Sequence, residues 1–485
     1  MKTNLTPISD ALSKDYMYVD NELQDAIKQV KLFSIFSRVG ISKRSGDSIP
    51  QIIFAVLVWP LLPVKSIAAF CGKFVSAYIH GGMNVIYDFL KREDINWRRV
   101  SSSTSKVVYD NHKLGNETES AFCVDDTIKH RRGKKVEGVS SHFDHTQTRH
   151  VMGQQTLKLG IATPKGMLPI DQQIYISEKK VQGLQAPFKD NRSAVAKDYE
   201  CALNQTKNEM FRTMLKRAVR LGFYAKHVLG DTWFGNKLNI KAVVDLCLTA
   251  IFMMKRGNLT FRFQNRHYTA TMLYHLIKRR MSAKKGQRFL TYSIEVELNL
   301  TEDKNDPPEW ITVRLVFSKP KQCHKDTWAV ILCTDPQYSI EKILKTYALR
   351  WSIEVYIKEI KQNMGFLKEQ TGDYAVHYAS IHLAAIRYTL FYNLFLANDS
   401  LSFGEIRNRI TGQLEQLSFA TVLWELFKSL IHGTLDHFEH EIGSKLISKI
   451  KKAIDSTVEN FLIKALQIDE ISVKNQLKAE ALGVL

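Results

Sequence analysis

The sequence lacks the features that mark membrane-spanning, secreted and zinc-binding proteins. Its longest apolar run covers residues 52–64, which is 13 residues interrupted by Pro60 and Pro63, whereas crossing a bilayer takes about 20 residues. The first ten residues, MKTNLTPISD, have no apolar stretch of the kind found in a signal peptide. The six cysteines form no CxxC pair, and thiols scattered through apolar strings are typical of a reducing compartment. We therefore expect a cytoplasmic protein without a membrane segment.

Acidic residues are scarce relative to basic ones. The 485 residues contain 68 Lys and Arg against 49 Asp and Glu, which leaves a formal net charge of +19. Such an excess indicates an anionic partner, and nucleic acid is the commonest one. The glycine pattern of a phosphate-binding loop is also absent, so the sequence gives no support to a nucleotide cofactor.

The periodicity of apolar residues divides the chain into three regions. Residues 1–118 show helical spacing, for example in LQDAIKQVKLFSIF, and predict a helical N-terminal domain. Residues 119–370 alternate short apolar strands with helices and contain a basic, β-rich insertion at about 257–327. The expected elements include two strands at 156–162 and 167–176, joined by a turn at 164–166, and a helix at about 194–220. Residues 371–485 are helical again. The predicted fold class is α/β, with helical regions on either side of the strand-containing region in the sequence.

Carboxylates follow separate predicted elements of the central region. Asp125 and Asp126 come after an apolar strand at 121–124, and Asp231 comes soon after another at 227–229. Glu354 lies on a predicted helix at about 339–363. Acids from distant parts of a chain can hold two divalent metal ions that activate the attacking oxygen in phosphodiester cleavage. Alternatively, an Asp at a strand end often serves only as a turn former or helix cap.

The predicted helix around Glu354 carries its charged and hydroxyl side chains on one stripe. Tyr347, Arg350, Glu354, Lys358 and Lys361 are spaced by three or four residues, which places them on one face of a helix. A solvated stripe of ion pairs has the same spacing. However, cations and a hydroxyl beside a carboxylate also suit a phosphate backbone that is held at a metal site.

These motifs resemble those of the insertion-sequence-4 family of DDE transposases. Tyr347, Arg350, Glu354 and Lys361 match the Tyr-Arg-Glu-Lys signature of that family. HVLGDTWFGN is similar to its middle motif and FCVDDT to its first motif, and the three occur in the family's order. The resemblance covers roughly residues 30–400 and implies a ribonuclease-H-like catalytic domain.

The resemblance also implies roles for individual residues. Asp125, Asp231 and Glu354 would bind the catalytic Mg²⁺, for which Mn²⁺ may substitute, and Tyr347, Arg350 and Lys361 would contact DNA phosphates. Asp125 and Asp126 point to opposite sides of a strand, so one of them faces the metals. The Asp-x-Thr spacing favours Asp125. Residues 1–118 would recognise the element's ends, residues 371–485 are a candidate dimerisation region, and the protein would be nucleoid-associated in a bacterium.

One segment of the insertion is strongly basic. Residues 255–290 contain ten Lys or Arg and no Asp or Glu. Lys255, Arg256 and Arg262 are candidate DNA contacts, because cations track phosphates and nearby aromatic rings can stack on exposed bases. The aromatic residues of this segment are Phe261, Phe263, Tyr268 and Tyr274. A solvated face over an ordinary β core is the alternative.

The sequence therefore predicts a cut-and-paste DNA transposase. It would cleave double-stranded DNA at the ends of an insertion sequence and join them to target DNA, acting as a homodimer. The alternatives are a non-catalytic DNA-binding descendant of a transposase and a stand-alone ribonuclease-H-like nuclease. Metal dependence separates the first alternative from a transposase, and joining to a second DNA separates the other.

Overall fold

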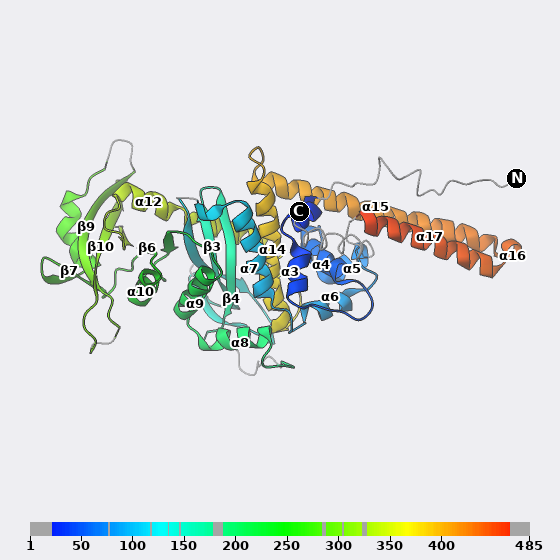
Figure 1. Cartoon of the computed structure of the whole chain (residues 1–485), viewed down its shortest axis with the longest axis horizontal. Helices are drawn as coiled ribbons and strands as arrows, with labels where there is room; N and C mark the ends of the chain where they lie inside the picture. The colour runs from blue at the N-terminus through cyan, green and yellow to red at the C-terminus, as the bar shows by residue number, and fades with distance from the viewer. Residues whose placement is uncertain are drawn as a thin grey trace. The chain divides into compact units, whose positions relative to one another are not determined.

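The structure is a computed structural model whose parts are labelled in Figure 1. The residues that it describes are 22–75, 78–116, 119–133, 135–144, 147–177, 188–283, 288–302, 305–322 and 327–465, with only the backbone at 420–422, 424–425 and 457–465. The first 21 residues of the predicted N-terminal domain and the last 20 of the predicted C-terminal region lie outside them.

The chain packs into two compact units. Unit 1 comprises the described parts of Met1–Val108, Pro187–Ala196 and Ile360–Leu485, and unit 2 those of Tyr109–Ala186 and Lys197–Glu359. Unit 1 thus contains segments from both ends of the sequence, which the sequence analysis treats as separate helical regions. Unit 2 contains the strands.

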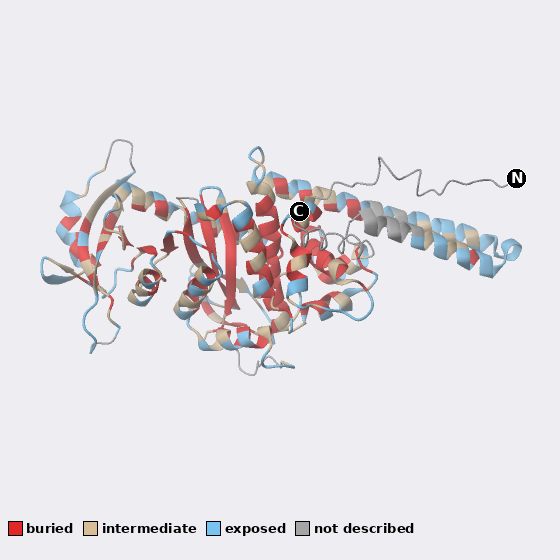
Figure 2. Ribbon diagram, in the orientation of Figure 1, coloured by how far each residue is buried: buried red, intermediate tan, exposed pale blue. Residues whose placement is uncertain are grey.

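Unit 1 is helical in its described residues. Its helices are α2 (Glu22–Gln29), α3 (Leu32–Arg38), α4 (Ile49–Val58), α5 (Ile67–Lys73), α6 (Met83–Leu90), most of α7 (Trp97–Asn111), α14 (Tyr374–Leu396), α15 (Phe403–His437), α16 (Glu439–Ile442) and α17 (Ser444–Ala465). Helix α14 is buried on nearly every side, whereas much of the hairpin of α15 and α17 is exposed (Figure 2). Among the described helices, none combines the length and apolar character that a bilayer crossing requires.

A buried arginine connects the helices of unit 1. Arg387 of α14 has no solvent exposure. Its guanidinium donates to the carbonyl oxygens of Leu57 (2.9 Å), Val56 (2.6 Å) and Met364 (2.9 Å). The last carbonyls of a helix lack partners within the helix, so Arg387 satisfies those at the C-terminal end of α4.

Unit 2 is built on one mixed sheet. Its strands are β1 (Ala121–His130), β2 (Ser140–Asp144), β3 (Arg149–Thr163), β4 (Gly166–Tyr175), β5 (His227–Gly230), β6 (Thr249–Met253), β7 (Thr260–Phe263), β8 (Arg266–Thr269), β9 (Phe289–Asn299), β10 (Trp310–Pro320) and β11 (Ala329–Cys333). The strand order is β2-β3-β1-β5-β6-β11-β10-β9-β7-β8, with β4 paired to β3. Strands β1, β5 and β6 are parallel neighbours, and β3 is antiparallel to β1. This mixed sheet with helices confirms the predicted α/β class and is consistent with a ribonuclease-H-like core.

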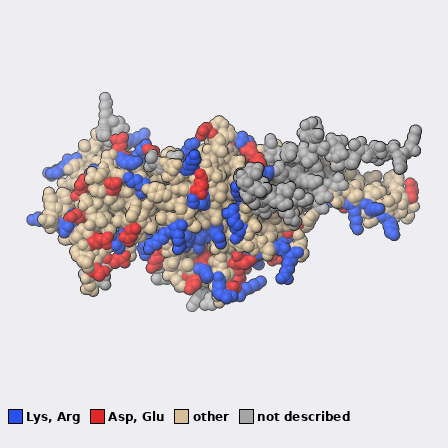
Figure 3. All heavy atoms as spheres, in the orientation of Figure 1, with Lys and Arg blue, Asp and Glu red and all other residues tan. Residues whose placement is uncertain are grey.

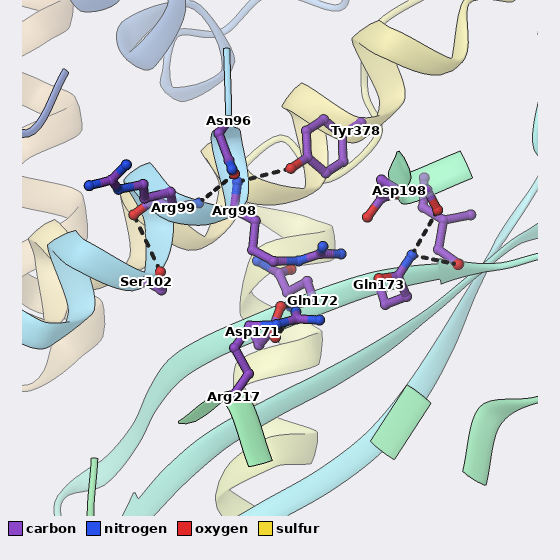
Figure 4. A network of polar contacts seen from close by, with 11 residues as sticks. Asn96, Arg98, Arg99, Ser102, Asp171, Gln172, Gln173, Asp198, Arg217 and Tyr378 are labelled. Carbon is purple, nitrogen blue, oxygen red and sulfur yellow. Dashed lines mark hydrogen bonds and ion pairs between the residues drawn. The ribbon is translucent and has the colours of Figure 1, made fainter. Parts of the chain in front are cut away.

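Helices pack on the sheet and connect its strands. They are α8 (Ala194–Asn204), α9 (Lys207–Arg220), α10 (Lys237–Asp245), α11 (Ala270–Ile277), α12 (Ile340–Ala348) and α13 (Trp351–Gln362), of which α8 and α13 cross a unit boundary. Helix α9 is tied to β4 by an ion pair between Arg217 and the buried Asp171 at 2.5 Å (Figure 4). Beside it, the side-chain amide of Gln173 donates to the carbonyl oxygen of Asp198.

A close approach of backbones fixes the pairing of β3 with β4. The register shifts between Leu159 and Gly160, where β4 has one extra residue. A Cβ atom at Gly160 would lie 2.5 Å from the carbonyl oxygen of Leu168. Only glycine therefore fits at this irregularity, which is typical of a β-bulge.

Three predicted elements have different bounds in the structure. Strand β1 continues to His130, so Asp125 and Asp126 lie within it rather than after it, because the chain goes on pairing with β3. The predicted helix at 194–220 is two helices, because Thr206 caps α9 and exchanges hydrogen bonds with Glu209. The predicted helix at 339–363 is also two helices, α12 and α13, separated at Leu349 and Arg350.

Candidate active site

Asp125 and Asp126 lie side by side in the middle of β1 and have different partners. Adjacent side chains of a strand point to opposite faces of the sheet. The Asp125 carboxylate lies 3.5 Å from the guanidinium of Arg350, and the Asp126 carboxylate lies 2.7 Å from the ammonium of Lys207. Asp125 therefore shares its side of the sheet with the segment that carries Glu354.

Asp231 directly follows β5, the parallel neighbour of β1. Its carboxylate accepts a hydrogen bond of 2.8 Å from the backbone N–H of Trp233, which holds the acid in a tight turn. The carboxyl ends of parallel strands form one edge of the sheet, where α/β proteins bind their ligands. The turn thus keeps the Asp231 carboxylate at this edge.

The break between α12 and α13 positions Arg350 against two carboxylates. Its guanidinium lies 2.5 Å from Glu354 and also reaches Asp125. Glu354 stands in the first turn of α13, where the helix dipole favours a negative charge. The hydroxyl of Tyr347, on α12, donates to the carbonyl oxygen of Gly230 at 3.4 Å. Tyr347 and Arg350, on either side of this break, therefore contact three places: the last residue of β5, the middle of β1 and the first turn of α13.

Negative charge accumulates around Asp125. Burial raises the pKa of its carboxyl to about 7, and the nearby charges of Asp126 and Asp231 act in the same direction. The Asp126 backbone N–H and Arg350 oppose this rise. Burial also raises the pKa of Tyr347 to about 12, so its hydroxyl keeps its proton at neutral pH. A cation at this place would relieve the repulsion among the carboxylates.

The three predicted metal ligands, all among the described residues, do not form one ready ligand group. In the described part of the chain, no three His, Cys, Asp or Glu side chains converge as a ready ligand group for a metal ion. Instead, Arg350 bridges Asp125 and Glu354. The donors themselves fit Mg²⁺ or Mn²⁺, which prefer carboxylate oxygens. A metal ion would compete with the guanidinium for the same two carboxylates.

The predicted DNA contacts occupy different environments. Lys361 lies in the last turn of α13, seven residues beyond Glu354 and on the same side of that helix. Lys255 is exposed, and its ammonium lies over the ring of Trp233. Arg256 packs on Trp328 and donates to its carbonyl oxygen. Arg262 lies 4.0 Å above the ring of Trp310 and pairs with Glu297.

The aromatic part of the basic-segment prediction is wrong at two positions. Phe261 and Tyr274 are each only 1% exposed. Tyr274 stacks on Trp328 with the ring centroids 4.3 Å apart. These rings belong to the core of the insertion and cannot stack on a base. Phe261 points inward because side chains alternate along β7, and Tyr274 points inward because it lies on the buried face of α11.

The structure adds three residues that the sequence analysis does not single out. Lys207 pairs with Asp126, and Trp233 is 42% exposed beside Asp231. Trp351, at the start of α13, is 63% exposed next to Arg350. Trp233 stands inside the motif HVLGDTWFGN and Trp351 directly follows Arg350, and these positions were the only signal in the sequence. Nothing in the sequence connects Lys207 to the site, because its partner is 81 residues away.

The chain is similar to two families of DNA-processing domains. A family model described as "DDE superfamily endonuclease" matches residues 73–280, which include Asp125 and Asp231. A second, described as "Transposase DDE domain", matches residues 188–390, which include Asp231 and Glu354. No curated protein matches the chain. The two matches support a transposase or endonuclease of the DDE type, with nuclease-type catalysis.

Proposed function

We propose that the chain is a cut-and-paste DNA transposase of the insertion-sequence-4 type. It cleaves double-stranded DNA at the ends of an insertion sequence and joins the freed 3′ ends to target DNA, acting as a homodimer. One observation carries the proposal: β1, the end of β5 and the first turn of α13 bring Asp125, Asp231 and Glu354 to one part of unit 2. The matches to DDE domains cover all three acids.

The three carboxylates are the proposed ligands of two Mg²⁺ ions. When bound, the metal ions supply activation of the attacking oxygen and stabilisation of the leaving oxygen. Arg350, released from Glu354, contacts a phosphate oxygen beside the bond that is cut. The protonated hydroxyl of Tyr347 donates to the DNA backbone, and Lys361 contacts a phosphate further along α13. Arg350 thus exchanges a carboxylate partner for a phosphate when DNA binds.

The proposal is tested by a cleavage and joining assay on labelled DNA that carries the ends of the element. Wild type is compared with Glu354→Gln and Asp231→Asn in Mg²⁺, in Mn²⁺ and with a chelator. Asp245→Asn on α10, whose exposed carboxylate pairs with Lys241, is the matched control. We expect metal-dependent 3′-hydroxyl ends and joined product in wild type and in the control, and neither in the two site variants.

Each other outcome identifies an alternative. DNA binding without cleavage in any protein would replace the proposal with a non-catalytic DNA-binding relic. Metal-dependent cleavage without joining would indicate a stand-alone nuclease. Cleavage that survives Glu354→Gln would place the active site elsewhere. A parallel comparison of Asp125→Asn with Asp126→Asn assigns the first ligand, and we expect cleavage to be lost only in Asp125→Asn.

A further inference from the structure

Two lysines from different elements surround one exposed tryptophan beside the candidate active site. The ammonium of Lys207 lies 4.1 Å from the centroid of the Trp233 ring, and that of Lys255 lies 4.5 Å from it. Lys207 is the first residue of α9, Trp233 lies in the turn after β5, and Lys255 follows β6. We call Lys207, Trp233 and Lys255 the Trp233 cluster.

The Trp233 cluster is poorly explained as a device for stability. A cation over an exposed aromatic ring contributes about 0.5–1 kcal/mol, and two ammonium groups held near one ring repel each other. Lys207 is only 12% exposed and has one compensating carboxylate, Asp126 at 2.7 Å. The cluster, Asp126 included, therefore keeps a net positive charge. An anion that binds both ammonium groups would turn this repulsion into attraction.

The position of the Trp233 cluster indicates which anion it meets. Trp233 follows Asp231 by two residues, and its backbone N–H donates to the Asp231 carboxylate. Asp126, which holds Lys207, follows Asp125 in β1 but points to the other face of the sheet, so the cluster approaches the candidate acids through Asp231 at the sheet edge. Lys and Arg side chains also gather over α9 on the face shown in Figure 3, and α9 carries five basic residues against one acid. The cluster thus adjoins Asp231, one of the three candidate catalytic acids, and lies next to a basic surface.

We propose that the Trp233 cluster binds one phosphate of the DNA backbone next to the phosphate that is cut. The two ammonium groups contact its non-bridging oxygens as point charges, and the Trp233 ring holds both lysine side chains in place. Trp233 is thus a positioning residue, and it links the phosphate contact to Asp231 through its own backbone. This inference rests on the proposed function, because it presupposes a DNA substrate.

The test measures binding of a labelled DNA duplex by fluorescence anisotropy, with a chelator present so that no cleavage occurs. Affinity is recorded between about 50 and 200 mM salt. The variants are Lys207→Gln, Lys255→Gln, Trp233→Leu and Trp233→Phe. Lys226→Gln is the matched control, because Lys226 is exposed and its ammonium also lies over an aromatic ring, that of Tyr338. Lys226 precedes β5, at the end of the strand away from Asp231.

We expect each cluster lysine variant to lower the slope of log affinity against log salt by about 1, as loss of one phosphate contact does. Trp233→Leu changes no charge, yet it should lower the slope in the same way, and Trp233→Phe should preserve it. Lys226→Gln should leave the slope as in wild type. Thermal unfolding of each variant serves as the check on folding.

The possible failures are distinguishable. A wild type that binds no DNA would overturn the proposed function and this inference together. If the wild type binds and cleaves DNA, but Trp233→Leu and Lys255→Gln have the same salt slope as the wild type, only the inference is overturned. Equal slopes for Lys226→Gln and Lys255→Gln would overturn it too, because the effect would then come from general electrostatics. A loss of thermal stability with an unchanged slope would reduce the cluster to a structural role.

Discussion

Asp125 stands directly opposite Lys158 in the antiparallel pairing of β1 with β3, and Lys158 is completely buried. Residues opposite each other in such a pair project from the same face of the sheet. The ammonium of Lys158 donates to the side-chain carbonyl of Gln172 at 2.5 Å and lies 5.8 Å from the ring centroid of Tyr356 on α13. A buried lysine thus connects β3, β4 and α13 beneath the first candidate carboxylate.

This connection predicts coupling between Lys158 and Gln172. Lys158→Met should lower the free energy of unfolding by about 1–3 kcal/mol, because it leaves a buried carbonyl oxygen without its donor. Gln172→Leu should also cost about 1–3 kcal/mol, because it leaves a buried donor without that acceptor. The double variant should lose less than the sum of the two. Denaturant unfolding measures all three, and additive losses would contradict the coupling.

We predict that the guanidinium of Arg350 and a metal ion compete for the carboxylates of Asp125 and Glu354. Its two ion pairs, to Asp125 and Glu354, use carboxylates that are proposed metal ligands. Arg350→Gln should therefore raise the affinity for Mg²⁺ roughly tenfold, which corresponds to about 1.4 kcal/mol, while DNA cleavage falls. Calorimetric titration of the DNA-free protein with Mg²⁺ or Mn²⁺ measures this. Weaker metal binding in Arg350→Gln would mean that Arg350 orients the carboxylates rather than competing for them.

His142 predicts a loss of stability in mild acid. Burial, with a further contribution from Lys207, lowers the pKa of His142 to about 4, whereas an unfolded histidine titrates near 6.5. Between these values the unfolded chain binds a proton that the folded protein excludes, so stability falls as the pH decreases. The full effect is about 3 kcal/mol below pH 4.

The matched variant for this prediction is His142→Gln, which has no titratable ring. The difference in unfolding free energy between wild type and His142→Gln should shift steadily against wild type from pH 7 to pH 4. Ring NMR signals of His142 report its pKa directly. A midpoint near 6.5 in the folded protein would refute the prediction.

We predict that unit 1 needs the planar guanidinium of Arg387 for its stability, and not only the positive charge. Arg387→Met removes the donors of three buried carbonyl oxygens, each of which costs about 1–3 kcal/mol when unsatisfied. Arg387→Lys keeps the charge but lacks the planar fork that reaches several acceptors at once. We expect both variants to lower the thermal midpoint clearly, as followed by circular dichroism. Full rescue by lysine would show that the charge alone suffices.

Local patterns carried much of the fold and the order of the motifs. The turn between the strands now labelled β3 and β4, the antiparallel pair β9 and β10, and the short strand before Asp231 follow from alternation and turn residues. The continuation of β1 through Asp125 was not predictable locally. Its polar residues Asp125 to His130 suit a loop by composition, and only pairing with β3 keeps them extended.

In the candidate site, too, local patterns indicated some features and only tertiary packing decided the others. The spacing of Tyr347, Arg350 and Glu354 indicated one helix, but the chain breaks at Arg350, and this break lets the guanidinium contact both Asp125 and Glu354. Lys207 and Trp233 are 26 positions apart and share no motif. Their contact depends on the packing of α9 against the strands.

The amino-acid sequence by itself determined the α/β class and the excess of positive charge, because composition and short-range periodicity reflect local backbone preferences and solvent exposure. The resemblance of its motifs to a known family indicated the candidate acids and their order. The tertiary structure alone decided that Asp125 shares a side with Glu354, that Asp126 holds Lys207, and that Phe261 and Tyr274 belong to the core. Such contacts join residues far apart in the chain. They are set by the register of strands and the packing of helices, which no local pattern specifies.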